Sequence, residues 1–152
     1  MNFSRLGRGE YLAVLGGLLL ALSLFLPWYA TNPDNRNAVI DGVRGSVTAF
    51  DAFPILRWLL LAAAVAPLIL AWVILRDHQL SWPRGELTAV VGMVAVVLVL
   101  YVGLVDRPGT PSSQIELRIG WFVALVGCGL IVFGGALRAS STERPRKPPG
   151  VL

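Results

Sequence analysis

Cysteine, histidine, lysine and charge in general are scarce in this sequence. The 152 residues include one cysteine, so no disulfide can form within the chain. Only 14% of the residues are charged and 55% are hydrophobic, whereas soluble domains have about 25% charged residues. A disordered chain would combine low hydrophobicity with high net charge, and this composition excludes that class. The composition therefore indicates a membrane protein.

The residues that build catalytic and metal sites are equally few. The one histidine, His78, is expected on a loop, and Cys128 is expected in the middle of a membrane helix. At such different depths they cannot share a metal ion or act as a nucleophile–base pair. The motifs HExxH, GxSxG and CxxC and the phosphate-loop motif do not occur. We therefore expect no enzymatic activity and no cofactor or metal, with Cys128 as a small packing residue.

Four long apolar runs dominate the chain. They predict helices at about residues 11–30, 55–75, 87–105 and 119–137, and about 20 residues suffice to cross a bilayer. The predicted fold class is an all-α membrane protein, a four-transmembrane-helix bundle over residues 1–137, followed by a disordered basic tail at 138–152. The first run is expected to stay uncleaved, because a cut after Ala30 would place Trp28 where a small residue is required.

The basic residues predict the orientation. With the N-terminus inside, the inner segments hold eight Arg and Lys residues and the outer segments hold five. Both termini are thus expected in the cytoplasm, with the chain in a bacterial cytoplasmic membrane. The net charge of +4 is interpreted as this topology signal, so nucleic acid is not an expected partner. Because all but one of the basic residues are arginine, the sequence also indicates GC-rich coding.

The longest connecting segment, residues 31–54, contains a turn motif. Asp41-Gly42 lies between short β-prone stretches, and both residue types accept the positive φ of a tight hairpin turn. The segment is expected to form a short extracellular β-hairpin or, alternatively, an irregular loop.

Small and aromatic residues predict how the helices are packed and anchored. Five aromatic residues are expected at the outer headgroup level as an aromatic belt: Trp28, Tyr29, Trp58, Tyr101 and Trp121. Small residues allow close helix contacts in lipid. The residues expected at such contacts are Gly16, Gly17, Gly120, Ala124, Gly127 and Gly134.

Three charged residues, Glu10, Asp51 and Arg57, are candidates for a polar site. Glu10 would pair with Arg138 if the first and fourth predicted helices are neighbours. Asp51 precedes Arg57 by six residues and would neutralise it. The alternatives for Arg57 are an unpaired side chain that extends to the membrane surface and a substrate-sensing role.

Three segments carry a resemblance to a known group of proteins. These are Leu-Pro-Trp-Tyr at 26–29, Ser-Val-Thr-Ala-Phe-Asp-Ala-Phe at 46–53 and Gly-Trp-Phe-Val-Ala-Leu at 120–125. Together they resemble the small four-helix integral membrane proteins of GC-rich Gram-positive, actinobacterial-type bacteria. The resemblance implies a fold and a membrane location but no activity.

The favoured functional hypothesis is a non-catalytic structural or accessory subunit. It would lie in the lipid bilayer and pack with itself or with a partner membrane protein. The alternative hypothesis is a small transporter or channel for an apolar or weakly polar solute. A lipid-modifying enzyme is a third hypothesis, for which the sequence offers no recognisable nucleophile and base.

Overall fold

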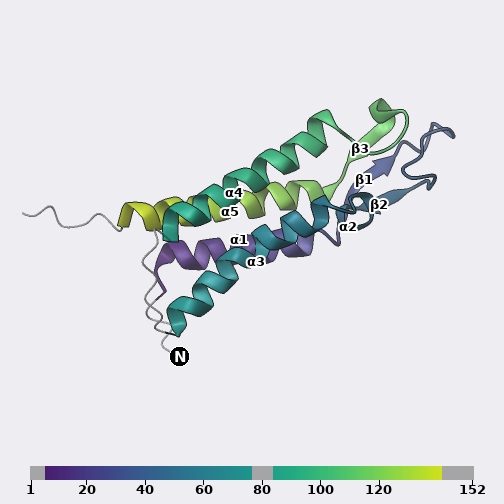
Figure 1. The fold of residues 1–152 in the computed structure, drawn as a ribbon. Coiled ribbons are helices and arrows are strands. Elements are labelled where there is room, and N and C mark those ends of the chain that lie inside the picture. The colour runs from purple at the N-terminus through teal and green to yellow at the C-terminus, as the bar shows by residue number, and fades with distance from the viewer. Residues whose placement is uncertain (1–5, 77–83, 142–152) are drawn as a thin grey trace, which may run out of the picture.

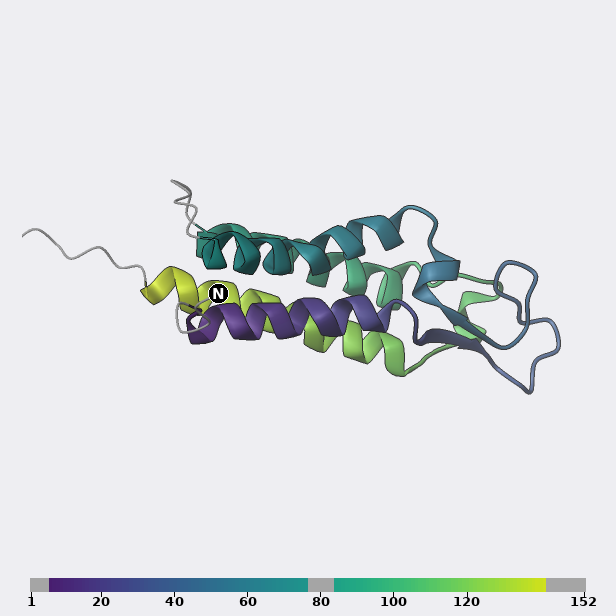
Figure 2. The ribbon, with the colours of Figure 1, turned by 90° about the horizontal axis from the view of Figure 1, so that it is seen from below.

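In the computed structural model, which describes residues 6–76 and 84–141, four long helices lie side by side and a small sheet covers one end of them (Figures 1 and 2). The long helices are α1 (Arg8–Ser23), α3 (Leu56–Leu75), α4 (Arg84–Leu100) and α5 (Ile119–Ser141). The sheet consists of β1 (Pro27–Thr31), β2 (Ser46–Thr48) and β3 (Ile115–Leu117). Two short helices accompany it, α2 (Ala49–Ala52) and the 3-10 helix η3 (Ser112–Gln114).

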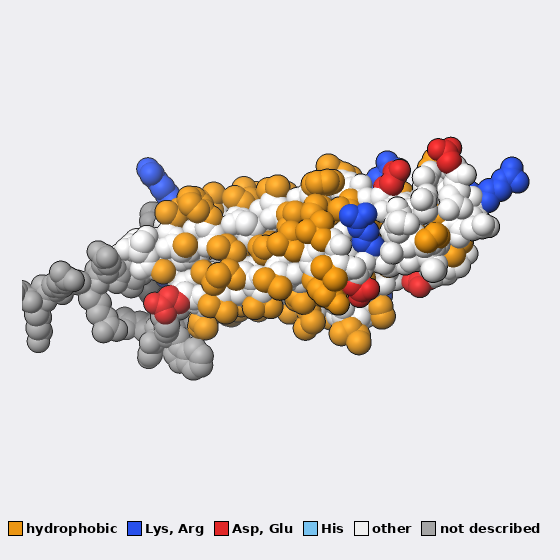
Figure 3. All heavy atoms as spheres, turned by 90° about the horizontal axis from the view of Figure 1, so that it is seen from above, with side chains coloured by type: hydrophobic (Ala, Val, Ile, Leu, Met, Phe, Trp, Pro, Cys, Tyr) orange, Lys and Arg blue, Asp and Glu red, His pale blue; other side chains and the backbone are white. Residues whose placement is uncertain are grey.

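Three helical segments in the described part of the chain are long and apolar enough to cross a membrane. They are Leu56–Leu75, Gly85–Val105 and Ile119–Ser141. On the face shown in Figure 3, hydrophobic side chains cover the helical part, whereas charged side chains gather toward the ends. Helix α1 has only 16 residues, which corresponds to about 24 Å. The fold is thus mostly helical with three candidate spans, and the small sheet makes the all-α prediction incomplete.

The prediction of a first helix over residues 11–30 is wrong at its outer end. Helix α1 ends at Ser23, and Pro27–Thr31 form the central strand β1. Pro27 has no backbone N–H and disfavours helical geometry in the residue before it. The strand then pairs antiparallel with β2 on one side and with β3 on the other, in the order β2-β1-β3. Backbone pairing with two distant segments therefore replaces the last turns of the predicted helix.

The other three helices lie close to their predicted positions. Helix α3 continues through Pro67 from Leu56 to Leu75. Helix α4 starts three residues earlier than predicted and passes into a π-helix, η2 (Tyr101–Val105), at its sheet end. Helix α5 extends to Ser141, so the first four residues of the predicted disordered tail are helical. The rest of that tail and the loop with His78 lie outside the described residues.

The Asp41-Gly42 motif forms the predicted tight turn. Asp41 has φ 49° and Gly42 has φ 77°, and this pair of positive values suits a two-residue hairpin turn. Ile40 and Val43 on either side exchange two backbone hydrogen bonds of 2.9 Å each. This pairing is an isolated bridge and does not belong to the main sheet. The next strand of the main sheet, β2, begins only at Ser46.

Candidate functional site

Glycines bring the backbones of α1 and α5 into direct contact. A Cβ atom on Gly16 would lie 2.5 Å from the carbonyl oxygen of Gly127, and one on Gly134 would lie 2.5 Å from that of Gly9. Such distances are far below van der Waals contact, so no side chain fits at either position. Ala124, one turn before Cys128, is fully buried in the same interface region. The small residues predicted at 16, 124, 127 and 134 thus lie within the bundle.

The remaining predicted packing glycines, Gly17 and Gly120, contact other parts of the same chain, as does Gly135. A Cβ on Gly17 would lie 2.4 Å from the carbonyl oxygen of Ala64 in α3. A Cβ on Gly120 would lie 2.4 Å from the ring of Trp28, and one on Gly135 would meet the α4 backbone at 2.5 Å. The small-residue stripe of α5 is therefore occupied within the monomer.

Gly129 is the exception among the five glycines of α5. A Cβ atom added there would have no neighbour within 4 Å, and the residue is exposed. It lies in an apolar groove of about 560 Å³ between α4 and α5. The groove is lined by Met93, Val96, Val97, Gly129, Val132, Phe133 and Ala136. Gly129 is not among the residues that the sequence predicts at helix contacts.

Glu10 and Arg138 form an ion pair that joins the start of α1 to the end of α5. Their side chains are only 13% and 21% exposed, respectively. They line a crevice of about 20 Å³ together with Thr88, which is itself buried. A space of that size holds about one water molecule. The conditional pairing predicted from the sequence is therefore present, because the two helices are neighbours.

Asp51 and Arg57 do not pair with each other. The side chain of Asp51 accepts a hydrogen bond from the Thr48 hydroxyl at 2.7 Å, and its backbone N–H donates to that hydroxyl. Thr48 is therefore the N-cap of α2, and the Asp51 carboxylate holds the capping hydroxyl in place. Arg57 instead donates from Nη1 to the Phe50 carbonyl oxygen at 3.0 Å. The three candidate charges therefore do not form one site. Glu10 pairs with Arg138, Asp51 bonds to Thr48 at the start of α2, and Arg57 has no carboxylate partner among the described residues.

The junction between the helices and the sheet is built from buried aromatic residues. Trp28 and Tyr29 are 0% exposed and Trp121 is 6% exposed, so these three do not belong to an aromatic belt in contact with lipid. Trp28 Nε1 donates to the Ser23 carbonyl oxygen at 2.8 Å and thereby closes the end of α1. Trp58 and Tyr101 are more than half exposed, as lipid-facing anchors would be.

Side chains from three segments hold the sheet end of α4. The Tyr29 hydroxyl donates to Val102 at 3.0 Å, Trp121 Nε1 donates to Val99 at 2.9 Å, and Arg107 Nε donates to Gly103 at 2.6 Å, in each case to the carbonyl oxygen. Carbonyl groups near a helix end lack partners within the helix. These bonds therefore satisfy buried carbonyl acceptors at the end of α4 and in the π-helical turn.

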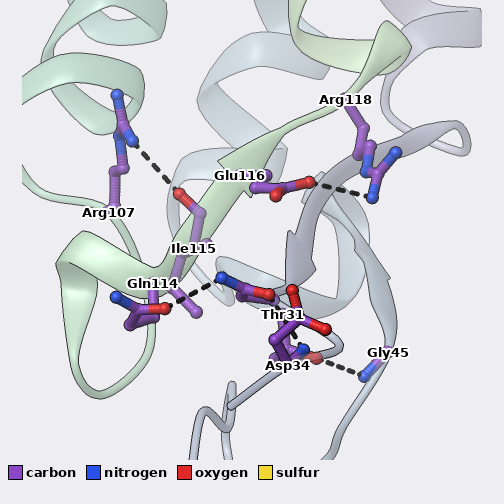
Figure 4. A network of polar contacts seen from close by, with 9 residues as sticks. Thr31, Asp34, Gly45, Arg107, Gln114, Ile115, Glu116 and Arg118 are labelled. Carbon is purple, nitrogen blue, oxygen red and sulfur yellow. Dashed lines mark hydrogen bonds and ion pairs between the residues drawn. The ribbon is translucent and has the colours of Figure 1, made fainter.

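Polar contacts also connect the strands and loops of the sheet (Figure 4). Arg107 reaches β3, where its Nη1 donates to the Ile115 carbonyl oxygen at 3.1 Å. The Gly45 N–H donates to the Thr31 hydroxyl at 2.9 Å. Arg118 and Glu116 form an exposed ion pair at 3.0 Å. We call the sheet with its loops, residues 27–54 and 106–118, the cap.

The buried phenol of Tyr29 predicts a loss of stability at high pH. Burial raises the pKa of Tyr29 above its ordinary value of 10.0, although the nearby Arg107 partly opposes this. The unfolded chain then releases the phenolic proton at a lower pH than the native protein does, so the free energy of unfolding should fall as the pH rises above about 10.

Chemical unfolding in detergent from about pH 8 to about pH 11 would measure this effect. The Tyr29→Phe variant is the control, because it has no ionisable group there. At neutral pH this variant should lose about 1 kcal/mol, the contribution of the hydrogen bond to Val102. An equal pH dependence in both proteins would contradict the prediction.

Neither the side-chain chemistry nor relatives point to a known activity. The described residues contain no group of three or more His, Cys, Asp or Glu side chains arranged to hold a metal ion. Comparisons with protein-family models, with curated proteins and with solved structures found no match to this chain. A functional assignment therefore rests on the geometry of the helices, the groove and the cap.

Proposed function

We propose that this chain is a non-catalytic integral membrane protein that forms a homodimer through the groove between α4 and α5. In this proposal it crosses a bacterial cytoplasmic membrane four times, with both termini in the cytoplasm and the cap outside. It acts as a structural or accessory subunit that holds a pair of caps at the outer membrane surface. The observation that carries the proposal is the open position at Gly129.

The fourth crossing would be provided by α1 and the three apolar residues after it. The contacts of Gly9 with Gly134, and of Leu26 and Trp28 with Gly120, place this segment beside α5 over most of its length. Phe25 and Leu26 extend the apolar surface beyond Ser23 and are exposed. Because this segment runs beside α5, it would lie at the same depth in the membrane as that spanning helix. We therefore expect α1 to cross the membrane although it is short.

The orientation follows from where the charged residues lie in the fold. The first described residues and the end of α5 lie at the end opposite to the cap (Figures 1 and 2). Eight of the 13 basic residues of the sequence belong to segments assigned to that end. Because cytoplasmic segments are enriched in Arg and Lys, the proposal places that end inside and the cap outside.

Gly129 supports association because glycine destabilises a helix and no contact within the monomer requires a glycine at this position. Glycine in a helix is less favourable than alanine by about 1 kcal/mol. The other four glycines of α5 allow close contacts with α1, α4 or the cap, but a side chain at 129 would meet nothing. A notch of this kind in an apolar groove suits the close approach of another membrane helix.

A second copy of the chain is the occupant that best fits the groove. Phe133 lies one helical turn from Gly129 on the same groove and is 56% exposed. The surface therefore combines a protruding ring with an adjacent notch. A twofold interface requires such self-complementarity, because the same patch contributes both surfaces. In the proposed dimer, the Phe133 ring of each copy lies over Gly129 of the other.

The experiment fills the notch without disturbing the monomer. Gly129→Leu should convert the dimer to a monomer in detergent or lipid nanodiscs, as measured by native mass spectrometry or light scattering. Thermal unfolding should show an intact fold, because the added side chain points into open space. Ala62→Leu, on an exposed part of α3, is the matched control and should leave the dimer intact.

Two outcomes would overturn the proposed self-association. The first is an unaltered protein that stays monomeric in lipid, or a Gly129→Leu variant that dimerises as well as the unaltered protein. The second is a different membrane protein that purifies from native membranes at equal stoichiometry and is lost in Gly129→Leu. That second result would make the chain a subunit of a hetero-complex.

A further inference from the structure

Arg57, in the first turn of α3, places its guanidinium beside two aromatic rings with only part of its hydrogen bonds made. Its guanidinium lies 4.8 Å from the ring centre of Phe50 and 5.5 Å from that of Trp58. Nη1 donates to the Phe50 carbonyl oxygen, but Nε is buried and has no hydrogen-bond partner. A buried donor without a partner is energetically unfavourable. The two rings and one hydrogen bond thus fix the position of a group that still has unused donors.

The surroundings of this guanidinium are apolar and exposed. Ile55 is 75% exposed and Trp58 is 55% exposed. Phe25, 62% exposed, stacks on Phe50 with ring centres 5.2 Å apart. Exposed apolar side chains around a cation are typical of the level where acyl chains meet lipid headgroups. The surroundings of Arg57 are thus those of a cation at that level of a membrane.

Helix α3 contributes further positive potential at the same place. Its first turn contains no acidic residue, and no side chain caps its N-terminus. The N-terminal end of a helix carries a partial positive charge, which adds to that of the guanidinium. The nearest acidic residue in the sequence, Asp51, is engaged with Thr48 and does not pair with Arg57. The described residues therefore leave this charge without a carboxylate.

We infer that Arg57 binds the phosphate group of an anionic phospholipid in the outer leaflet. A guanidinium forms strong, charge-assisted hydrogen bonds to phosphate oxygens. In the proposed arrangement the terminal Nη donors of Arg57 that do not bond Phe50 contact the phosphate, while Ile55 and Trp58 contact the upper acyl chains. The inference rests on the membrane placement proposed above but does not depend on the dimer.

The test compares defined lipids on the delipidated, full-length protein. Native mass spectrometry would measure the binding of the first lipid molecule during titration with phosphatidylglycerol or phosphatidylcholine. Phosphatidylglycerol should bind more tightly, because the choline group neutralises the phosphate of phosphatidylcholine. Arg57→Gln should weaken phosphatidylglycerol binding roughly tenfold, as expected for the loss of a charged hydrogen bond. Arg57→Lys should retain part of the affinity, because it keeps the charge but loses the planar donor group.

Two controls test whether the lipid binds at Arg57 and through both its headgroup and its acyl chains. Arg118→Gln removes a cap arginine that already pairs with Glu116, and it should leave lipid binding unchanged. Inorganic phosphate should not compete, because it lacks the acyl chains that contact the apolar side chains. Measuring the dimer fraction in the same spectra shows whether the lipid result is independent of self-association.

Three results would overturn the inference. These are equal binding of the two lipids by the unaltered protein, full phosphatidylglycerol binding by a folded Arg57→Gln variant, and displacement of the lipid by inorganic phosphate. The last result would identify a site for free phosphate. If Arg57→Gln fails to fold, the comparison of the two lipids on the unaltered protein and the Arg57→Lys variant still decides the question.

Discussion

Gly127→Ala is expected to unfold at a lower temperature than the unaltered protein, whereas Gly129→Ala, two residues further along the same helix, is not. A Cβ at position 127 would lie 2.8 Å from both the Gly16 carbonyl oxygen and the Leu20 nitrogen. These are backbone atoms of α1, so they cannot rotate away as a side chain would. The two helices must separate, and overpacking of this kind costs about 1–3 kcal/mol or more.

The comparison of these two alanine variants removes the effect of helix propensity. Both replace glycine in α5, so both gain about 1 kcal/mol in helix propensity. Only Gly127→Ala also introduces a clash. Thermal unfolding in the same detergent would measure the difference. If the two variants unfold at the same temperature, α1 and α5 do not pack as closely as the structure describes.

Removing either partner of the Glu10–Arg138 ion pair is expected to destabilise the bundle strongly. Both side chains are largely buried, and a single neutralisation leaves the other charge without its partner. Breaking a buried ion pair in this way costs about 3–5 kcal/mol. Glu10→Gln and Arg138→Gln should each lower the unfolding midpoint because the remaining charge must either stay buried or pull its helix end toward water.

The double variant distinguishes an ion pair from two independent effects. Glu10→Gln combined with Arg138→Gln leaves no unpaired charge, so it should be more stable than at least one of the single variants. Double-mutant cycles isolate such a coupling energy. Additive losses in the double variant would show that the two charges act separately. Arg118→Gln in the exposed pair with Glu116 is the control and should cost no more than about 1 kcal/mol.

The amino-acid sequence by itself determined the helices that depend on local hydrophobicity. The apolar runs near α3, α4 and α5 predict their positions to within a few residues, because hydrocarbon length and backbone hydrogen bonding leave a long apolar segment few alternatives. The Asp41-Gly42 turn is equally local, since two adjacent residues supply the positive φ values. The pairing of Glu10 with Arg138 was predicted only on the condition that their helices are neighbours.

The tertiary structure decided features whose partners are distant in the sequence. From the sequence, Trp28 and Tyr29 are expected at the end of a membrane helix. In the structure they belong to strand β1, which pairs with the strands around positions 47 and 117. Hydropathy cannot distinguish an aromatic residue in lipid from one buried under a cap. Arg57 likewise contacts aromatic rings instead of Asp51, because α2 directs that carboxylate to Thr48.

The glycines of α5 also show which features the sequence determines and which depend on the tertiary packing. Their small size predicts that something approaches closely, and the sequence specifies this property at every one of them. Which atoms approach depends on how α5 is rotated against its neighbours. The structure assigns Gly127 and Gly134 to α1 and Gly135 to α4, and it leaves Gly129 open. Local sequence determines that a helix can be approached, whereas the packing of the whole chain determines which face remains available.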